Sequence, residues 1–180
     1  MIGVLVSGEG TNLQALIDAG LPVVAVAANV TDAPALRRGA AAGAATAAFP
    51  LDDYADREAR DAAMADWLQG HGITLVVLAG YMHILRRPFL ERFPGRIVNV
   101  HPALLPAFPG AHAVEDALAA GVEETGATVH LVDEGVDTGP ILRQEPVPVL
   151  PGDTSALLHA RIRAVEHRLL PAVVRELVET

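Results

Sequence analysis

An amide, an imidazole and a carboxylate stand out in this chain because together they could perform acyl transfer. Asn99 and His101 lie two residues apart at the end of the apolar run 97–101, so in a strand they share one face. Asp137 follows in the turn-rich stretch 132–140. The amide can donate to a developing oxyanion, the imidazole can exchange protons near neutral pH, and the carboxylate can stabilise the charged imidazole.

Each of these residues also has a simpler interpretation. Asn99 could cap the end of a strand, His101 could be a hydrogen-bonded core histidine, and Asp137 could close an Asx turn. No serine or cysteine nucleophile elbow accompanies them. The combination of the three, with a glycine-rich loop near the start of the chain, favours catalysis over the simpler interpretations.

Composition excludes several classes of protein. The 180 residues fit one domain, and no apolar run approaches the roughly 20 residues that cross a bilayer. The net charge of −9 argues against binding to nucleic acid, and the absence of cysteine excludes disulfides and thiolate metal sites. Met1 leads straight into a strand-like run without a basic, signal-like segment, so we expect a cytoplasmic protein.

The elements that must position these residues follow a βαβ rhythm. Short apolar runs alternate with helix-like segments such as 13–19 and 57–68, and the runs lie at 2–6, 23–28, 75–79 and 97–101. Because the runs are apolar on both faces, they are typical of parallel strands covered by helices. The fold class predicted is α/β, a single open, mostly parallel twisted sheet flanked by helices, which is Rossmann-like.

The pattern changes after Ala111. We expect a helix at 114–120, strands at 125–132 and 141–150, and a long final helix from about 154 to 179. Asp153 or Thr154 would cap that last helix, because Pro151 and Gly152 break the chain just before it. The sheet should therefore end in a C-terminal strand or hairpin.

A glycine loop, residues 7–14 (SGEGTNLQ), comes directly after the first predicted strand. Glycine lets the backbone approach a ligand, and Thr11 and Asn12 could cap the following helix so that free N–H groups face an anion. The loop is neither a Walker sequence nor a complete Rossmann fingerprint. A tight turn with a helix cap is the alternative, but the position after the first strand favours an anion site.

Four blocks of the chain are informative in combination: 7–13 (SGEGTNL), 78–85 (LAGYMHIL), 99–106 (NVHPALLP) and 137–140 (DTGP). In this order they resemble the phosphoribosylglycinamide formyltransferases, folate-dependent enzymes of purine biosynthesis and one-carbon metabolism. The resemblance covers nearly the whole chain. It implies a formyltransferase fold and transfer of a formyl group from 10-formyltetrahydrofolate to the amine of glycinamide ribonucleotide.

The resemblance also implies roles for individual residues. Asn99, His101 and Asp137 would be catalytic, and Gly10, Thr11, Asn12 and Glu166 would bind the ribonucleotide. The folate would contact a larger set, namely Arg57, Met82, His83, Ile84, Leu85, Asn99, Asp133, Glu134, Gly135, Val136 and Asp137. The single domain 1–180 would have a phosphate-binding half at about 1–100 and a folate-binding, catalytic half at about 97–180.

Three positions depart from the sequences that this resemblance rests on. His83 stands where the best-known relatives have arginine, Ala103 replaces a common serine, and Thr138 replaces the glycine beside Asp137. None of the three central residues is missing.

Other functions stay open at the level of sequence. The formyl acceptor could be a different amine, or water could replace it and make the protein a hydrolase of the formyl folate. A non-catalytic nucleotide-binding module is a third reading, with His101 in the core. We expect no metal, because the seven histidines form no tight ligand motif, and we expect His130 to support the site or the core. The expected partners are the two small substrates, without nucleic acid or membrane, and the chain would act as a monomer or homodimer.

Overall fold

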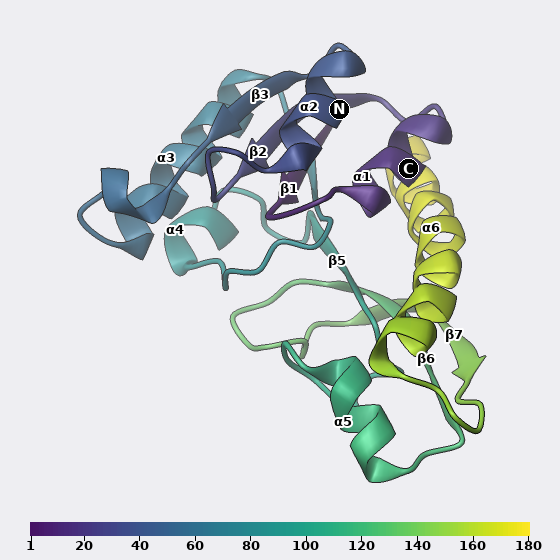
Figure 1. Ribbon diagram of the computed structural model, residues 1–180. Helices are drawn as coiled ribbons and strands as arrows, with labels where there is room; N and C mark the ends of the chain where they lie inside the picture. Colours follow the sequence, from purple (N-terminus) through teal and green to yellow (C-terminus); the bar gives the residue numbers. More distant parts are fainter. The chain divides into compact units, whose positions relative to one another are not determined.

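Alternating strands and helices build Met1–Val98, the first of two units in the computed structural model (Figure 1), which describes residues 1–180. The strands are β1 (Ile2–Val6), β2 (Val23–Ala28), β3 (Ala45–Ala48) and β4 (Leu75–Leu78). The helices are α1 (Thr11–Asp18), α2 (Pro34–Ala41), the 3-10 turn η1 (Leu51–Asp53), α3 (Arg57–Gly70) and α4 (Arg87–Leu90). The strands lie in the order β3-β2-β1-β4, and each neighbouring pair is parallel.

Burial explains why these runs form a parallel sheet. Every residue of β1 and β4 is buried, so both faces of these strands are covered. On the helices, Leu13 and Leu16 of α1 and Met64 and Leu68 of α3 have no exposed surface. The predicted strands at 2–6 and 23–28 are confirmed with their bounds, and the strand predicted at 75–79 ends one residue earlier.

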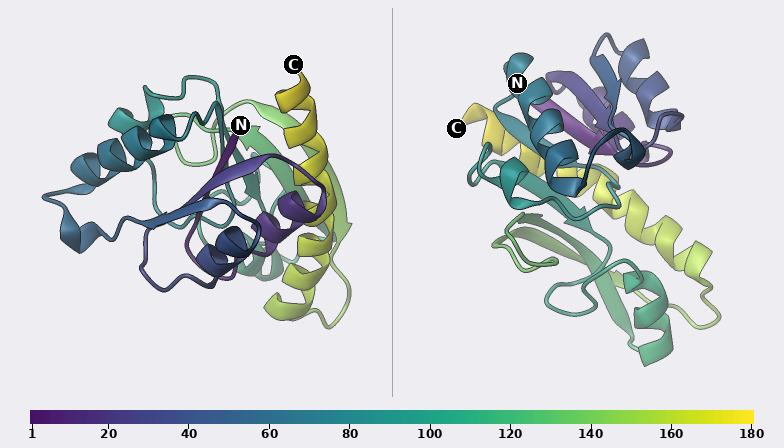
Figure 2. Two further views of the ribbon diagram at one scale, coloured as in Figure 1. Left: turned by 90° about the horizontal axis from the view of Figure 1, so that it is seen from above. Right: turned by 90° about the vertical axis from the view of Figure 1, so that its left-hand side faces the viewer.

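The second unit, Asn99–Thr180, has a different connectivity. Strand β5 (Ile97–His101) crosses the division between the units, and β6 (Glu124–Leu131) and β7 (Ile141–Pro148) complete the sheet order. β6 and β7 are antiparallel, and α5 (Ala113–Ala120) precedes them. The long helix α6 (Ser155–Glu179) runs alongside β6 and β7 in the views of Figures 1 and 2.

The predicted fold class is confirmed. The seven strands form one open, mostly parallel sheet with helices, and the sheet ends in an antiparallel pair followed by a long helix. Of the two residues proposed to cap that helix, Thr154 does so, because its side chain accepts a hydrogen bond from Leu157 N at 3.2 Å. Asp153 instead forms an ion pair with Arg161.

The predicted cap of α1 is wrong. Gly10, rather than Thr11 or Asn12, precedes the helix, and no side chain caps it. Gly10 has φ 75°, a left-handed conformation in which the chain turns from β1 into α1 without help from a capping side chain. A glycine at the N-cap offers no side-chain acceptor to the first N–H groups of α1, which suits an anion site at the start of a helix.

Candidate active site

The catalytic amide and imidazole predicted from sequence lie at the end of β5. Asn99 and His101 are separated by one residue of an extended strand, so their side chains project from the same face, while Val98 and Val100 are buried on the other. Pro102 follows at once and has no N–H to continue the strand pairing. The strand therefore ends at His101 and the chain turns into the loop 102–110.

His101 is buried, and both of its ring nitrogens face oxygen atoms. Nε2 donates to the Phe108 carbonyl at 2.8 Å, and Nδ1 lies 3.4 Å from Asp137 Oδ2. A carbonyl and a carboxylate can only accept, so the doubly protonated ring satisfies both contacts at once. The loop and the carboxylate are thus arranged to accommodate a positive charge on His101.

Backbone conformation at both contacts is unusual. Phe108 and Asp137 are the two non-glycine residues of the chain with positive φ, at 52° and 55°. Such conformations are uncommon for residues with a side chain and concentrate at functional sites. Both residues contact the same imidazole, one through its carbonyl and the other through its carboxylate.

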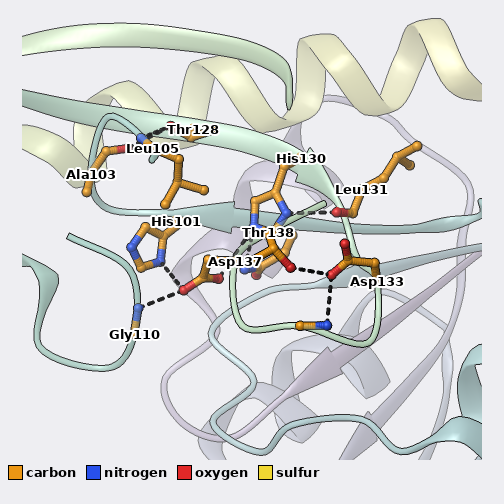
Figure 3. A network of polar contacts seen from close by, with 12 residues as sticks. His101, Ala103, Leu105, Gly110, Thr128, His130, Leu131, Asp133, Asp137 and Thr138 are labelled. Carbon is orange, nitrogen blue, oxygen red and sulfur yellow. Dashed lines mark hydrogen bonds and ion pairs between the residues drawn. The ribbon is translucent and has the colours of Figure 1, made fainter. Parts of the chain in front are cut away.

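The Asp137 carboxylate lies between two histidine rings, as Figure 3 shows. Its Oδ2 accepts a hydrogen bond from Gly110 N at 2.8 Å, and its Oδ1 lies 3.5 Å from His130 Nε2. Burial alone would raise the pKa of Asp137, but the His130 ring, the Gly110 N–H and the His101 ring together lower it below the ordinary value of 3.8. Asp137 is therefore an anion at neutral pH.

His130 fixes the direction of the Asn99 amide. Its Nδ1 lies 2.8 Å from the Leu131 carbonyl, which can only accept, so Nδ1 carries a proton. Nε2 lies 3.2 Å from Asn99 Nδ2 and 3.5 Å from Asp137 Oδ1, so it contacts the amide and the carboxylate together. His130 therefore links the Asn99 amide to the Asp137 carboxylate.

A buried hydroxyl anchors the loop that follows His101. Thr128 Oγ1 donates to the Ala103 carbonyl at 2.7 Å and accepts from Leu105 N at 3.1 Å (Figure 3). Gln144 Nε2 reaches the same hydroxyl at 3.0 Å and the Leu105 carbonyl at 2.7 Å. These bonds hold the start of the loop whose later residues contact His101 and Asp137.

The remaining predicted residues of this unit lie on the loop after β6 and on α6. Asp133 accepts hydrogen bonds from Gly135 N at 2.9 Å and Thr138 Oγ1 at 2.7 Å, which close the loop, whereas Glu134 and Val136 are exposed. Glu166 is only 5% exposed, so it is not a solvated side chain on the surface of α6.

In the first unit, the glycine loop packs against α2. Gly8 O accepts from Ala35 N at 3.0 Å, and Arg38 Nε donates to Glu9 O at 2.7 Å. A Cβ on Gly10 would lie 2.5 Å from the Ala35 Cβ, closer than such atoms approach. The close approach and the left-handed φ both require glycine here, and Thr11 and Asn12 come directly after it in the first turn of α1.

The predicted folate-contacting segment of this unit alternates between exposed and buried side chains. Met82 is 65% exposed and Ile84 46% exposed, whereas Leu85 is buried and His83 is partly buried. Two exposed apolar side chains this close in sequence suit a surface that a flat, largely apolar ligand would cover. Arg57, the other predicted residue here, is the first residue of α3.

Sequence reasoning missed two features of the structure. It did not foresee the link between His130 and Asn99, although Thr128 and His130 are two residues apart in β6 and so share a face. It also missed the buried ion pair of Arg60 and Asp61 on α3, for which the charge pattern of the helix gives no signal.

The structure has neither a cluster of metal-ligand side chains nor a membrane-spanning helix. No group of three or more histidine, aspartate or glutamate side chains is arranged to hold a metal ion. No helix has both the length and the apolar character needed to cross a membrane.

Comparison with known proteins gives consistent results. The family model described as formyl transferase matches residues 1–174. The phosphoribosylglycinamide formyltransferase of Mycobacterium tuberculosis is 51% identical over 178 residues, which cover 97% of this chain and 83% of that protein. The human trifunctional purine biosynthetic protein adenosine-3 is 41% identical over 97% of this chain, which corresponds to 18% of that longer protein.

Solved structures agree with the sequence matches. Glycinamide ribonucleotide transformylase 1 from Symbiobacterium toebii superimposes with a TM-score of 0.97 at 48% identity, covering 99% of this chain and 87% of that one. Phosphoribosylglycinamide formyltransferase from Streptococcus pneumoniae gives 0.94 at 45% identity, covering 98% of both chains. This chain belongs to the formyl transferase family, in the branch of the phosphoribosylglycinamide formyltransferases.

Proposed function

We propose that this protein transfers the formyl group of 10-formyltetrahydrofolate to the amine of 5'-phosphoribosylglycinamide, giving formylglycinamide ribonucleotide and tetrahydrofolate for purine biosynthesis. Family membership supports the reaction. The observation that carries it is the arrangement at the end of β5, where Asn99, His101 and Asp137 form one connected set of polar contacts through His130.

Asn99 stabilises the negative charge that develops when the substrate amine attacks the formyl carbonyl. Its Nδ2 is held by His130 and donates an N–H to the oxyanion of the tetrahedral intermediate. The amine attacks directly, so no covalent enzyme intermediate is needed.

His101 supplies charge and a proton. In its protonated form it stabilises the oxyanion and then donates to N10 of the departing folate, which otherwise leaves as a poor anion. Asp137 stabilises the imidazolium electrostatically and orders the water through which the proton of the attacking amine is relayed. The Phe108 carbonyl holds the His101 ring in place before the ring donates its proton.

Substrate contacts are proposed from both units. Gly10, Thr11 and Asn12 would bind the ribose phosphate through the first N–H groups of α1, where the helix dipole favours an anion. Glu166 would contact the same substrate. The folate would contact Arg57 and residues 82–85 in the first unit, and Asn99 and residues 133–137 in the second.

The domain roles follow from this assignment. The N-terminal half would supply the phosphate site, and the C-terminal half would supply the catalytic residues and part of the folate contacts. We propose that the protein acts in the cytoplasm, as a monomer or homodimer, on these two small molecules and without a metal ion.

The test is the conversion of 10-formyltetrahydrofolate followed by absorbance, with and without the ribonucleotide. We expect turnover that requires the ribonucleotide and is lost in His101→Ala. His71→Ala is the matched control, because His71 lies at the end of α3, where its ring contacts only the carbonyl and the ring of the nearby Trp67. Turnover without the acceptor would identify a hydrolase, and binding without folate chemistry would identify a nucleotide-binding module.

A further inference from the structure

A buried ion pair on α3 lies outside the catalytic residues described above. Arg60 and Asp61 both have no exposed surface, and Arg60 Nε lies 2.7 Å from Asp61 Oδ1. A buried pair of this kind seldom adds stability, because removing two charges from water costs about as much as their attraction returns. In addition, Arg60 Nη2 is buried without a hydrogen-bond partner. The pair therefore calls for an explanation other than stability.

Arg60 decides the protonation of His83. Arg60 Nη1 lies 2.8 Å from His83 Nδ1, and a guanidinium can only donate. Nδ1 must therefore be the bare nitrogen of a neutral ring, and the ring proton must be on Nε2. The contact has room for one hydrogen, so protonation of Nδ1 would place two donors against each other.

Asn29, next to the end of β2, completes the arrangement around the ring. Its amide nitrogen lies 3.3 Å from His83 Nε2, while its Oδ1 is buried without a partner. Because Nε2 carries the proton, the amide satisfies it by presenting oxygen, and a half turn of the amide does so. Arg60 and Asn29 thus fix both nitrogens of His83.

The Asp61 side chain holds the segment 82–86 by accepting a hydrogen bond from the backbone of that segment. Asp61 Oδ2 accepts a hydrogen bond from Arg86 N at 2.6 Å, and Met82 N donates to Ser7 Oγ at 2.9 Å. Together with the His83 ring, these bonds fix the segment 82–86 at three points. Met82 and Ile84 stay exposed between the fixed points.

We propose that Arg60 is a positioning residue, which with Asp61 holds His83 as a neutral Nε2–H ring and fixes residues 82–85 for binding of the formyl donor. The second half of this inference rests on the proposed function. The first half is independent of it and concerns the free protein alone.

Taken together, burial and the charged groups around His83 oppose its protonation. Burial, followed by the positive charges of Arg60 and Arg57, lowers the pKa of His83 below its ordinary value of 6.5, and Asp61 offsets only part of this effect. Tyr81, whose ring centroid lies 6.0 Å from that of His83, is neutral because burial raises its pKa. His83 therefore stays neutral through the physiological range.

The test removes both charges together, because Arg60→Met alone would leave Asp61 buried as an uncompensated anion. Arg60→Met/Asp61→Leu keeps the volume and takes away the contacts to His83 and Arg86. The matched control is Arg92→Met/Asp66→Leu, which removes an ion pair that also involves α3 but whose side chains are 42% and 59% exposed. Thermal melts of both variants establish that they are folded.

Two readouts separate positioning from a general structural role. In nitrogen NMR spectra of histidine-labelled protein without ligand, we expect wild-type His83 to show a bare Nδ1 and a protonated Nε2, and to titrate at a higher pH in the Arg60→Met/Asp61→Leu protein only. In the assay, we expect KM for the formyl donor to rise about tenfold, with kcat and KM for the ribonucleotide within about twofold of wild type.

Either readout can overturn the inference. A His83 ring protonated on Nδ1 in the wild type, or with the same titration in both double variants, would exclude control by Arg60. An unchanged KM for the donor in a folded Arg60→Met/Asp61→Leu protein would exclude the role in binding. If the wild type showed no folate chemistry at all, the proposed function would fail, while the NMR result would still decide the control of His83.

Discussion

Asp137 Oδ2 lies 3.4 Å from Nδ1 of His101, close enough for an ion pair once the imidazole is charged. The carboxylate is held there by Gly110 N and by a backbone with φ 55°. Gly110 closes the loop that begins after His101, so the same loop places the histidine's partner and, through the Phe108 carbonyl, its other contact. His101 and Asp137 are 36 positions apart in the sequence, and the fold brings the Asp137 carboxylate and the Phe108 carbonyl to the same imidazole ring.

Asp137→Asn should change how stability depends on pH. The substitution is nearly isosteric, and asparagine tolerates a left-handed backbone well. Because the folded protein lowers the pKa of Asp137 below 3.8, the ionised carboxylate stabilises the native state above that value. The advantage of wild type over the variant should be constant near neutral pH and shrink as the pH falls through the lowered pKa.

Chemical denaturation between about pH 3 and pH 7 measures this effect. Asp32→Asn is the control, since Asp32 is exposed in the turn before α2 and should leave the profile unchanged. A stability difference that stays constant down to the lowest pH would mean that His101, His130 and Gly110 do not stabilise the Asp137 anion. In the assay, Asp137→Asn should also lower kcat, because a neutral amide cannot stabilise the imidazolium.

Asn99→Ala should reduce kcat by about 10²- to 10³-fold, which is the cost of removing one oxyanion donor. KM for either substrate should change little, because the interaction forms chiefly in the transition state. Asn99→Asp should be at least as slow, since it places an acceptor where the oxyanion develops. Steady-state kinetics with a thermal melt of each variant distinguish this from unfolding, and near-normal turnover of Asn99→Ala would refute the assignment.

Gly10→Ala should destabilise the first unit and weaken binding of the ribonucleotide. A side chain at φ 75° and a Cβ contact of 2.5 Å with Ala35 both oppose the substitution, so we expect a loss of about 1–3 kcal/mol in the free energy of unfolding. Gly8→Ala is the matched control, because nothing lies within 4 Å of a Cβ at Gly8. Equal stability of the two variants in urea would show that the loop relaxes at Gly10.

The strands were predictable from sequence because continuous apolar runs have few alternatives to burial in a parallel sheet. Strands 2–6, 23–28 and 97–101 were predicted with their observed bounds for this reason. The cap of α1 could not be predicted from sequence, because Thr11 and Gly10 are both acceptable residues before a helix. Only the packing of Gly10 against Ala35 decides between them. Arg60 shows the same limit: it resembles Arg57 in sequence, yet tertiary packing buries one completely and leaves the other partly exposed.

Two buried threonines of β6 provide the sharpest test of how the loop after His101 is held. Thr128 Oγ1 bonds to Ala103 O, Leu105 N and Gln144 Nε2, whereas Thr125 Oγ1 is buried without a partner. Thr128→Val keeps the shape but leaves those polar groups unsatisfied, which should cost about 1–3 kcal/mol of stability. Thr125→Val buries no new polar group and removes an unsatisfied one, so it should be neutral or stabilising.

The two variants should also differ in activity. Thr128→Val frees the start of the loop that supplies the Phe108 carbonyl and Gly110 N, so the contacts of His101 and Asp137 should loosen and kcat should fall. Thr125→Val should leave kcat unchanged. Urea denaturation and steady-state kinetics on the pair decide the matter. If both threonines tolerate valine equally, the loop must be held by its own backbone, and the polar bonds to Thr128 would have no part in placing His101 and Asp137.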